Sequence, residues 1–198
     1  RARGSYTVRQ RRIGLVEAGY SQPPHYRLRP DAAGLLRYSY CTPDFIMSSL
    51  TMAAHPEEDW AAISSQNRWS GVIFRGAVDA RVYPTGYNSA GESTSNAAWA
   101  VQAGGTLIAQ KLKAGRGADE WRVWFSVAGL SAPVRVGPWI FAESAGAFVG
   151  VRVARGEFGF VNEDGNKRGR WLKCSDDFSP VIIEVAPKQD GLTFGAFQ

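Results

Sequence analysis

The feature that most constrains this chain is its succession of short apolar blocks, separated by glycine, proline, asparagine and aspartate. Apolar residues alternate with polar ones or run in blocks too short for a helix, and only 57–63 offers a single helical turn. Aromatic residues make up 12% of the chain and favour strands over helices. The chain is therefore expected to fold almost entirely into β-strands.

These blocks predict a series of closely spaced strands without helical crossovers. The predicted strands cover residues 26–28, 35–40, 45–52, 69–74, 80–83, 98–102, 106–112, 121–127, 134–136, 139–141, 148–153, 157–161, 171–174 and 181–185. Neighbouring strands must then be antiparallel, because parallel neighbours need long connections. So many strands split into two packed layers, which predicts an all-β, supersandwich-like two-layer antiparallel β-sandwich with little helix.

The length of 198 residues suits one large all-β domain, and we expect residues 1–198 to form a single β-sandwich domain. The chain begins at Arg1 without a methionine and ends at Gln198 without a polar tail. We therefore expect it to be cut from a longer protein. A polar loop is predicted at 84–96, where its length exceeds that of a hairpin turn, and Tyr83 and Tyr87 beside it could line a cleft.

The net charge of +5 comes from the first part of the chain, since residues 1–37 hold eight arginines against Glu17 and Asp31. Such a cluster can dock on an acidic domain surface, an anionic polysaccharide or a nucleic acid, or it can simply be solvated. Nucleic acid is disfavoured, because neither zinc-finger spacing nor an RNA-binding aromatic motif is present. No apolar run approaches 18 residues, so no membrane span is expected.

The polar and aromatic residues are densest between Tyr38 and Arg75. His55 could transfer a proton near neutral pH, or it could sit in an exposed turn. Gln66, Asn67, Arg68 and Trp69 combine amides, a guanidinium and a stacking ring, which is the mixture that sugar recognition needs, although a buried network is an equal reading.

The remaining aromatic and sulfur-containing residues carry weaker signals. The tryptophans in strand-like segments are expected to fill the core or an inter-domain contact: Trp99, Trp121, Trp124, Trp139 and Trp171. Cys41 and Cys174 could form a disulfide or stay as free thiols. No cysteine and histidine set has metal-ligand spacing, and no cofactor is expected.

Several blocks in order resemble the C-terminal β-region of bacterial heparinase II/III-like proteins, in which a helical (α/α) toroid precedes the β-layers. The resemblance spans about residues 6–198 and rests on these segments: YSYCTPDFIMSS, EEDWAAISSQNRWSGVIF, WAVQAGGTLIAQKL, EWRVWFSVAGL, WIFAESAGAFVGVRV and SPVIIEVA. It implies a polysaccharide lyase or glycoside hydrolase acting on a poly- or oligosaccharide in a cleft shared with an upstream toroid. It also implies an extracellular or periplasmic location.

In related lyases a tyrosine and a histidine act as acid and base, and an amide or arginine neutralises the uronate carboxylate. Carried over, the resemblance suggests Tyr40 and His55 as catalytic residues and Gln66, Asn67 and Arg68 as substrate-binding residues. Trp69, as a stacking ring, and Tyr87, at the polar segment, are added as substrate-binding residues from the sequence itself. A carbohydrate-binding or structural β-sandwich without catalysis is the alternative. A third possibility is a capsid- or adhesin-like sandwich that assembles with copies of itself.

Overall fold

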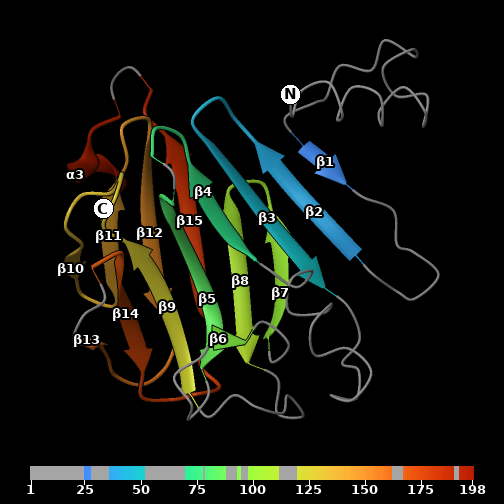
Figure 1. Cartoon of the computed structure of the whole chain (residues 1–198), viewed down its shortest axis with the longest axis vertical. Coiled ribbons are helices and arrows are strands. Elements are labelled where there is room, and N and C mark those ends of the chain that lie inside the picture. Colours follow the sequence, from blue (N-terminus) through green and yellow to red (C-terminus); the bar gives the residue numbers. More distant parts are fainter. Residues whose placement is uncertain are drawn as a thin grey trace.

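A computed structural model of the chain shows the two predicted antiparallel sheets (Figure 1). It describes residues 25–27, 36–51, 70–77, 79–87, 93–94, 98–111, 120–161, 167–189 and 192–198. The predicted turn at 57–63 and the basic cluster, apart from the backbone at 25–27 and 36–37, lie outside these ranges. The prediction of an all-β antiparallel sandwich is confirmed.

The larger sheet, sheet A, has nine described strands. Their order is β1 (His25–Arg27), β2 (Leu36–Cys41), β3 (Phe45–Thr51), β4 (Gly71–Phe74), β5 (Arg81–Tyr87), β9 (Glu120–Ser126), β14 (Gly169–Cys174) and β13 (Phe158–Val161), and β6 (Ser93–Thr94) pairs with β5. The first five strands form a meander, whereas β9 and β14 join it from far along the sequence. Sheet A therefore brings three distant segments side by side at β5, β9 and β14.

The smaller sheet, sheet B, packs behind sheet A in Figure 1 and has six described strands. Their order is β10 (Val134–Val136), β11 (Trp139–Glu143), β12 (Ala147–Val153), β15 (Val181–Pro187), β8 (Thr106–Lys111) and β7 (Ala98–Ala103). The chain passes repeatedly between the sheets, and β15 enters sheet B between β12 and β8. Each sheet is therefore built from segments that are far apart in the sequence.

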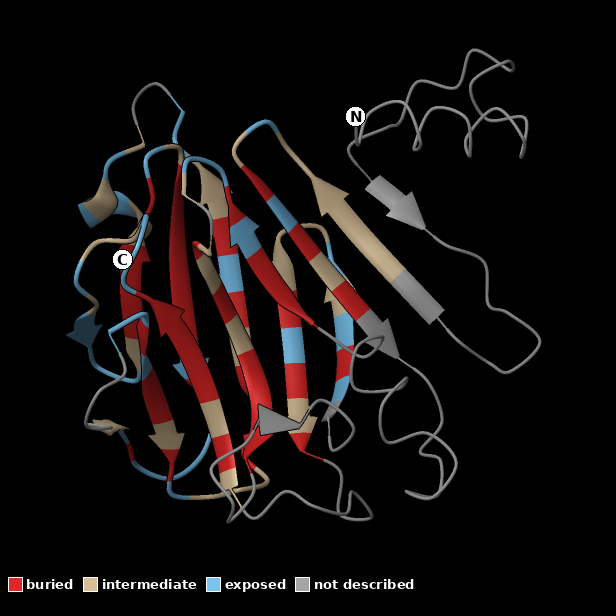
Figure 2. Cartoon of the chain, in the orientation of Figure 1, coloured by how far each residue is buried: buried red, intermediate tan, exposed pale blue. Residues whose placement is uncertain are grey.

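Strand alternation places the core between the sheets. Val82, Val123 and Leu172 of sheet A and Val149 and Ile183 of sheet B have no exposed surface, and Figure 2 shows the facing strands largely buried. Because successive side chains point to opposite faces of a strand, the residues between them lie on the outer faces.

The prediction of a loop at 84–96 is wrong at its start. Residues 84–87 continue β5, where Gly86 lies opposite Trp121 and Tyr87 lies opposite Glu120. Their polar and turn-forming composition suggested a loop, but pairing with β9 supplies hydrogen bonds that local propensity could not indicate. Residues 88–92 and 95–97 lie outside the described part of the chain.

A short helix that the sequence did not indicate, α3 (Phe194–Phe197), covers part of the outer face of sheet B. The Thr193 side chain caps it by accepting a hydrogen bond from the Ala196 amide. Phe197 packs against Phe141 and Phe148, with ring centroids 5.8 and 5.6 Å apart. In the described structure no helix is long and apolar enough to cross a membrane.

A matched pair of isoleucines tests this assignment of core and surface. Ile183 has no exposed surface, whereas Ile73 on the outer face of sheet A is 46% exposed. We expect Ile183→Ala to lower the free energy of unfolding by about 2–5 kcal/mol because it leaves a cavity. Ile73→Ala should cost less than about 1 kcal/mol. Urea unfolding of both variants measures the difference, and equal losses would contradict the assignment.

Candidate functional site

Four aromatic rings gather on the outer face of sheet A, where β5, β9 and β14 meet. We call Tyr83, Tyr87, Trp124 and Trp171 the aromatic cluster. Trp124 lies opposite Tyr83 on one side and opposite Trp171 on the other. The ring centroids of Trp124 and Trp171 are 4.7 Å apart, and those of Tyr87 and Trp171 are 5.3 Å apart, in edge-to-face arrangements. Such pairs add favourable interaction beyond their buried area.

The Trp124 ring is fixed by its neighbours. Its indole Nε1 donates a hydrogen bond to Ser126 Oγ over 3.1 Å, and the Arg81 amide donates to the same oxygen over 3.1 Å. Ser126 Oγ in turn donates to the Asp79 carbonyl. A Cβ at position 169 would overlap the Trp124 ring, so Gly169 makes the room that this ring fills.

The turn before β5 carries backbone strain next to the cluster. Asp79 has a φ of 104°, which is uncommon for a residue other than glycine and costs about 1–3 kcal/mol. Two interactions hold it there: its carbonyl accepts from Ser126, and its carboxylate pairs with Arg81 Nη2 at 2.8 Å. The Arg81 guanidinium carbon lies 5.4 Å from the Tyr83 ring centroid. Burial raises the pKa of Tyr83, and the Arg81 charge opposes that rise.

Three charged residues border the cluster on its other side. Glu120 bridges Arg122 and Lys173: its Oε2 lies 2.7 Å from Arg122 Nε and 2.6 Å from Arg122 Nη2, and its Oε1 lies 2.5 Å from Lys173 Nζ. We call these residues the Glu120 triad. The Arg122 guanidinium carbon also lies 3.7 Å from the Tyr87 ring centroid, within the range of a cation–π contact.

The triad determines the ionisation of Glu120. Partial burial would raise the pKa of this carboxyl, but hydrogen bonds from Lys173 and Arg122 and their positive charges outweigh burial and lower the pKa. Glu120 is therefore a carboxylate at neutral pH. It orients both cations rather than serving as a proton donor.

Tyr83, Trp124 and Trp171 form a row across three strands, and this row lies between two sets of basic residues. Arg81 precedes Tyr83 on β5, while Arg122 and Lys173 lie opposite each other beyond Trp124 and Trp171. Trp124 and Trp171 are each only 6% exposed and form a floor. The side chains of Arg81 and Lys173 are 38% and 42% exposed. Water-accessible cations thus flank a rigid aromatic floor, and Tyr83, which is half-buried, stands at its side.

Two sequence-predicted site residues have described side chains, and they lie on opposite faces of sheet A. Tyr87 belongs to the aromatic cluster, whereas Tyr40 points between the sheets, opposite the fully buried Met47, and packs edge-on against Phe45 at 5.7 Å. The sheets are tied together near Tyr40, since Gln102 Nε2 donates to the Met47 carbonyl over 3.0 Å. His55, Gln66, Asn67, Arg68 and Trp69 lie outside the described residues.

Several residues of the face were missed from the sequence. Five tryptophans were expected to fill the core or an inter-domain contact. Trp121 lies in the sandwich core, and Trp124 and Trp171 are buried in the separate aromatic cluster. Trp99 and Trp139 lie on the outer face of sheet B. The available signal was the alternation in β9. Trp121, Val123 and Phe125 already make one apolar face, which leaves Arg122 and Trp124 on the other.

The described residues form neither a metal site nor a disulfide. In the part of the chain that the structure describes, no group of three or more histidine, cysteine, aspartate or glutamate side chains could hold an ion. Cys41 and Cys174 are both free thiols, and burial, reinforced by Asp177 and Asp176, raises the pKa of Cys174 to about 12. Cys174 is thus an unreactive core residue.

Comparison with known proteins gives no relative for this chain. No protein-family model, no curated protein and no solved structure matches it.

The Glu120 triad predicts a specific pH dependence of stability. A carboxylate whose pKa is lowered on folding stabilises the fold above its unfolded pKa, near 4.5, and loses that contribution as the pH falls through the lowered folded value. Glu120→Gln should therefore be less stable than wild type at pH 7. The difference in free energy of unfolding between wild type and Glu120→Gln should become smaller below about pH 4.5. Urea unfolding at several pH values measures it, and a constant gap would contradict the role of the triad.

Proposed function

We propose that this domain binds an acidic carbohydrate on the outer face of sheet A, as the β-domain of a carbohydrate-active protein. The observation that carries the proposal is the placement of exposed Arg81 and Lys173 on either side of the rigid aromatic cluster. Both parts come from residues that are distant in sequence, and cross-strand pairing holds both of them in place.

The chemistry of the face suits a sugar that carries a carboxylate or sulfate. A pyranose presents C–H groups on its ring face, which pack against an aromatic side chain such as Tyr83, and hydroxyls at its edge, which hydrogen-bond to charged side chains. Guanidinium and ammonium groups pair well with an anionic substituent. Because Glu120 holds Arg122 and Lys173 before any ligand arrives, little side-chain entropy is lost on binding.

The further step to an enzyme is supported by the resemblance to heparinase II/III-like proteins. In that proposal the domain forms one wall of a glycan cleft of a polysaccharide lyase or glycoside hydrolase, and an upstream helical toroid forms the other wall. Tyr40 and His55 remain the proposed catalytic residues, with Gln66, Asn67, Arg68 and Trp69 binding substrate beside Tyr87.

A structural role without glycan binding is the second candidate function. It is favoured by the burial of Trp124 and Trp171, since rings that are 6% exposed can serve to hold three strands together. In that case substitutions in the cluster would lower stability and leave every sugar unbound.

Glycan binding by single-residue variants tests the proposal. We expect the chain to bind uronate-containing polysaccharides more tightly than neutral ones. Tyr83→Ala should weaken that binding at least about tenfold, which corresponds to about 1.4 kcal/mol, by removing the half-buried ring between the cations. Affinity electrophoresis or calorimetry with a panel of acidic and neutral polysaccharides measures both effects.

The matched control is Trp99→Ala, because Trp99 is 43% exposed but lies on the outer face of sheet B. It should leave glycan affinity unchanged. If Trp99→Ala weakened polysaccharide binding as much as Tyr83→Ala does, or if acidic and neutral polysaccharides bound equally well, the outer face of sheet A would not be the binding site. No binding to any polysaccharide would favour the structural candidate.

A further inference from the structure

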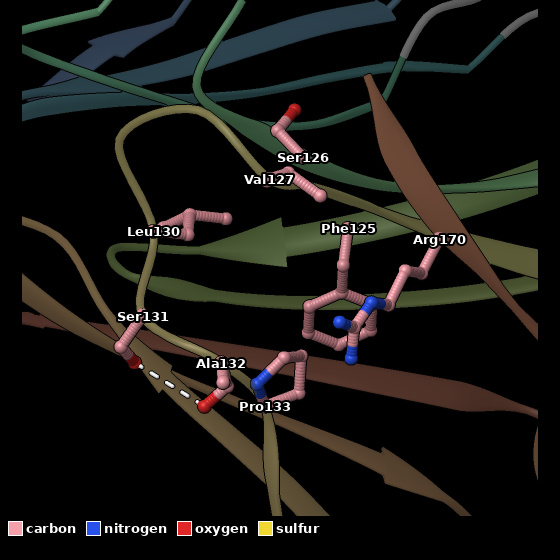
Figure 3. Close-up of a pocket in the computed structure, with 8 residues that line it drawn as sticks. All are labelled: Phe125, Ser126, Val127, Leu130, Ser131, Ala132, Pro133 and Arg170. Carbon is pink, nitrogen blue, oxygen red and sulfur yellow. Dashed lines mark hydrogen bonds between the residues drawn. The ribbon is translucent and has the colours of Figure 1, made fainter. Parts of the chain in front are cut away.

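A small pocket lies away from the aromatic cluster, where the connection from β9 to β10 crosses from sheet A to sheet B. Its volume is about 120 Å³, well below the roughly 300–1,000 Å³ of sites for drug-sized ligands, so it suits a small molecule. Figure 3 shows Phe125, Leu130 and Pro133 around it, with Arg170 beside them.

Hydrogen bonds at both ends of residues 127–133 hold the pocket open. The Val127 amide donates to the Arg168 carbonyl over 2.9 Å, and the Ser131 amide donates to the Glu143 carbonyl over 2.8 Å. The Glu143 amide returns a bond to Ser131 Oγ over 3.0 Å. Residues 127–133 are thus fastened to sheet A at one end and to sheet B at the other. A ligand would find the site already formed, which reduces the cost of binding.

The pocket is lined mainly by apolar residues and by one cation, Arg170. Phe125 is 1% exposed and lies opposite Arg170 in the β9–β14 pairing. Leu130 packs against the core, and Pro133 adds a rigid apolar wall. Within the described ranges, no side chain forms an ion pair with the exposed Arg170. Glu143 of β11, to which Ser131 is hydrogen-bonded, pairs with Lys188 at 2.7 Å.

We propose that this pocket binds a small carboxylate with an apolar body, whose carboxylate pairs with Arg170 and whose body rests on Phe125, Leu130 and Pro133. A planar guanidinium offers two parallel N–H donors, which match the two oxygens of a carboxylate. The largely apolar lining favours a short aliphatic or aromatic group over a sugar, because Phe125, Leu130 and Pro133 offer no side-chain hydrogen-bond partner to a sugar's hydroxyls.

This site is independent of the glycan-binding face. Phe125 points into the sandwich and Trp124 points out of it, because they are successive residues of β9. Ser126 lines the pocket and also contacts the cluster, and its hydroxyl is already used by Trp124, Arg81 and Asp79. The pocket could therefore be occupied whether or not a carbohydrate is bound.

Benzoate is the test ligand, and benzamide, which has nearly the same shape without the charge, is its control. We expect millimolar benzoate to shift the backbone amide NMR signals of residues 127–132 and 170, and benzamide to bind at least about tenfold more weakly. Arg170→Gln should abolish the preference for benzoate. Arg152→Gln should preserve it, because Arg152 is also exposed but lies on the outer face of sheet B.

Three outcomes would overturn the proposal: no shifts at millimolar benzoate, equal binding of benzamide, or unchanged preference in Arg170→Gln. Tyr83→Ala separates the two sites, since it should leave benzoate binding intact. Likewise, Arg170→Gln should leave polysaccharide binding intact. Failure of one site can thus be distinguished from failure of the other.

Discussion

The burial of one face of β5, β9 and β14 is the constraint on which the rest of the molecule depends. Val82, Val123, Phe125 and Leu172 all turn into the sandwich and have almost no exposed surface. Because side chains alternate, a slip of one residue in any of these strands would move its apolar residues to the solvent face and its aromatic-cluster residue into the core. The hydrophobic core therefore fixes the register that assembles the outer face.

On the outer face of sheet A, buried rings and more exposed charged groups have different roles. Trp124 and Trp171 are packed so tightly that they act as a floor, and their mutual contact fixes the spacing of β9 and β14. The Glu120 triad neutralises part of the positive charge that would otherwise accumulate there, and it places Lys173 at the edge of the floor. Rigid rings with positioned cations at their border are what the proposed glycan-binding role requires, whereas aliphatic residues would serve a purely structural sheet equally well.

The sequence predicted the fold class because strand periodicity and turn residues are local. It could not predict which strands are neighbours, since the pairing of β5 with β9 and of β9 with β14 joins segments tens of residues apart. Tyr87 was proposed because it lies in a polar segment that was expected to be a loop, although that segment begins as a strand. Trp124 and Trp171 were missed because a tryptophan in an alternating strand has the same local pattern whether it faces a core or an outer surface. Arg170 gave no signal at all, because its pocket exists only where residues 127–133 cross between the sheets.

The opposite orientations of Tyr40 and Tyr87 limit how any glycan could use both residues. Tyr40 packs between the sheets beside Phe45, and Tyr87 stands on the outer face under Arg122. One sugar ring cannot contact both, because a layer of backbone separates the two faces of a sheet. If Tyr40 takes part in catalysis, the reacting bond must lie at the edge of the sandwich near β2. The aromatic cluster would then hold a different sugar of the same chain, so recognition and chemistry would be separable by mutation.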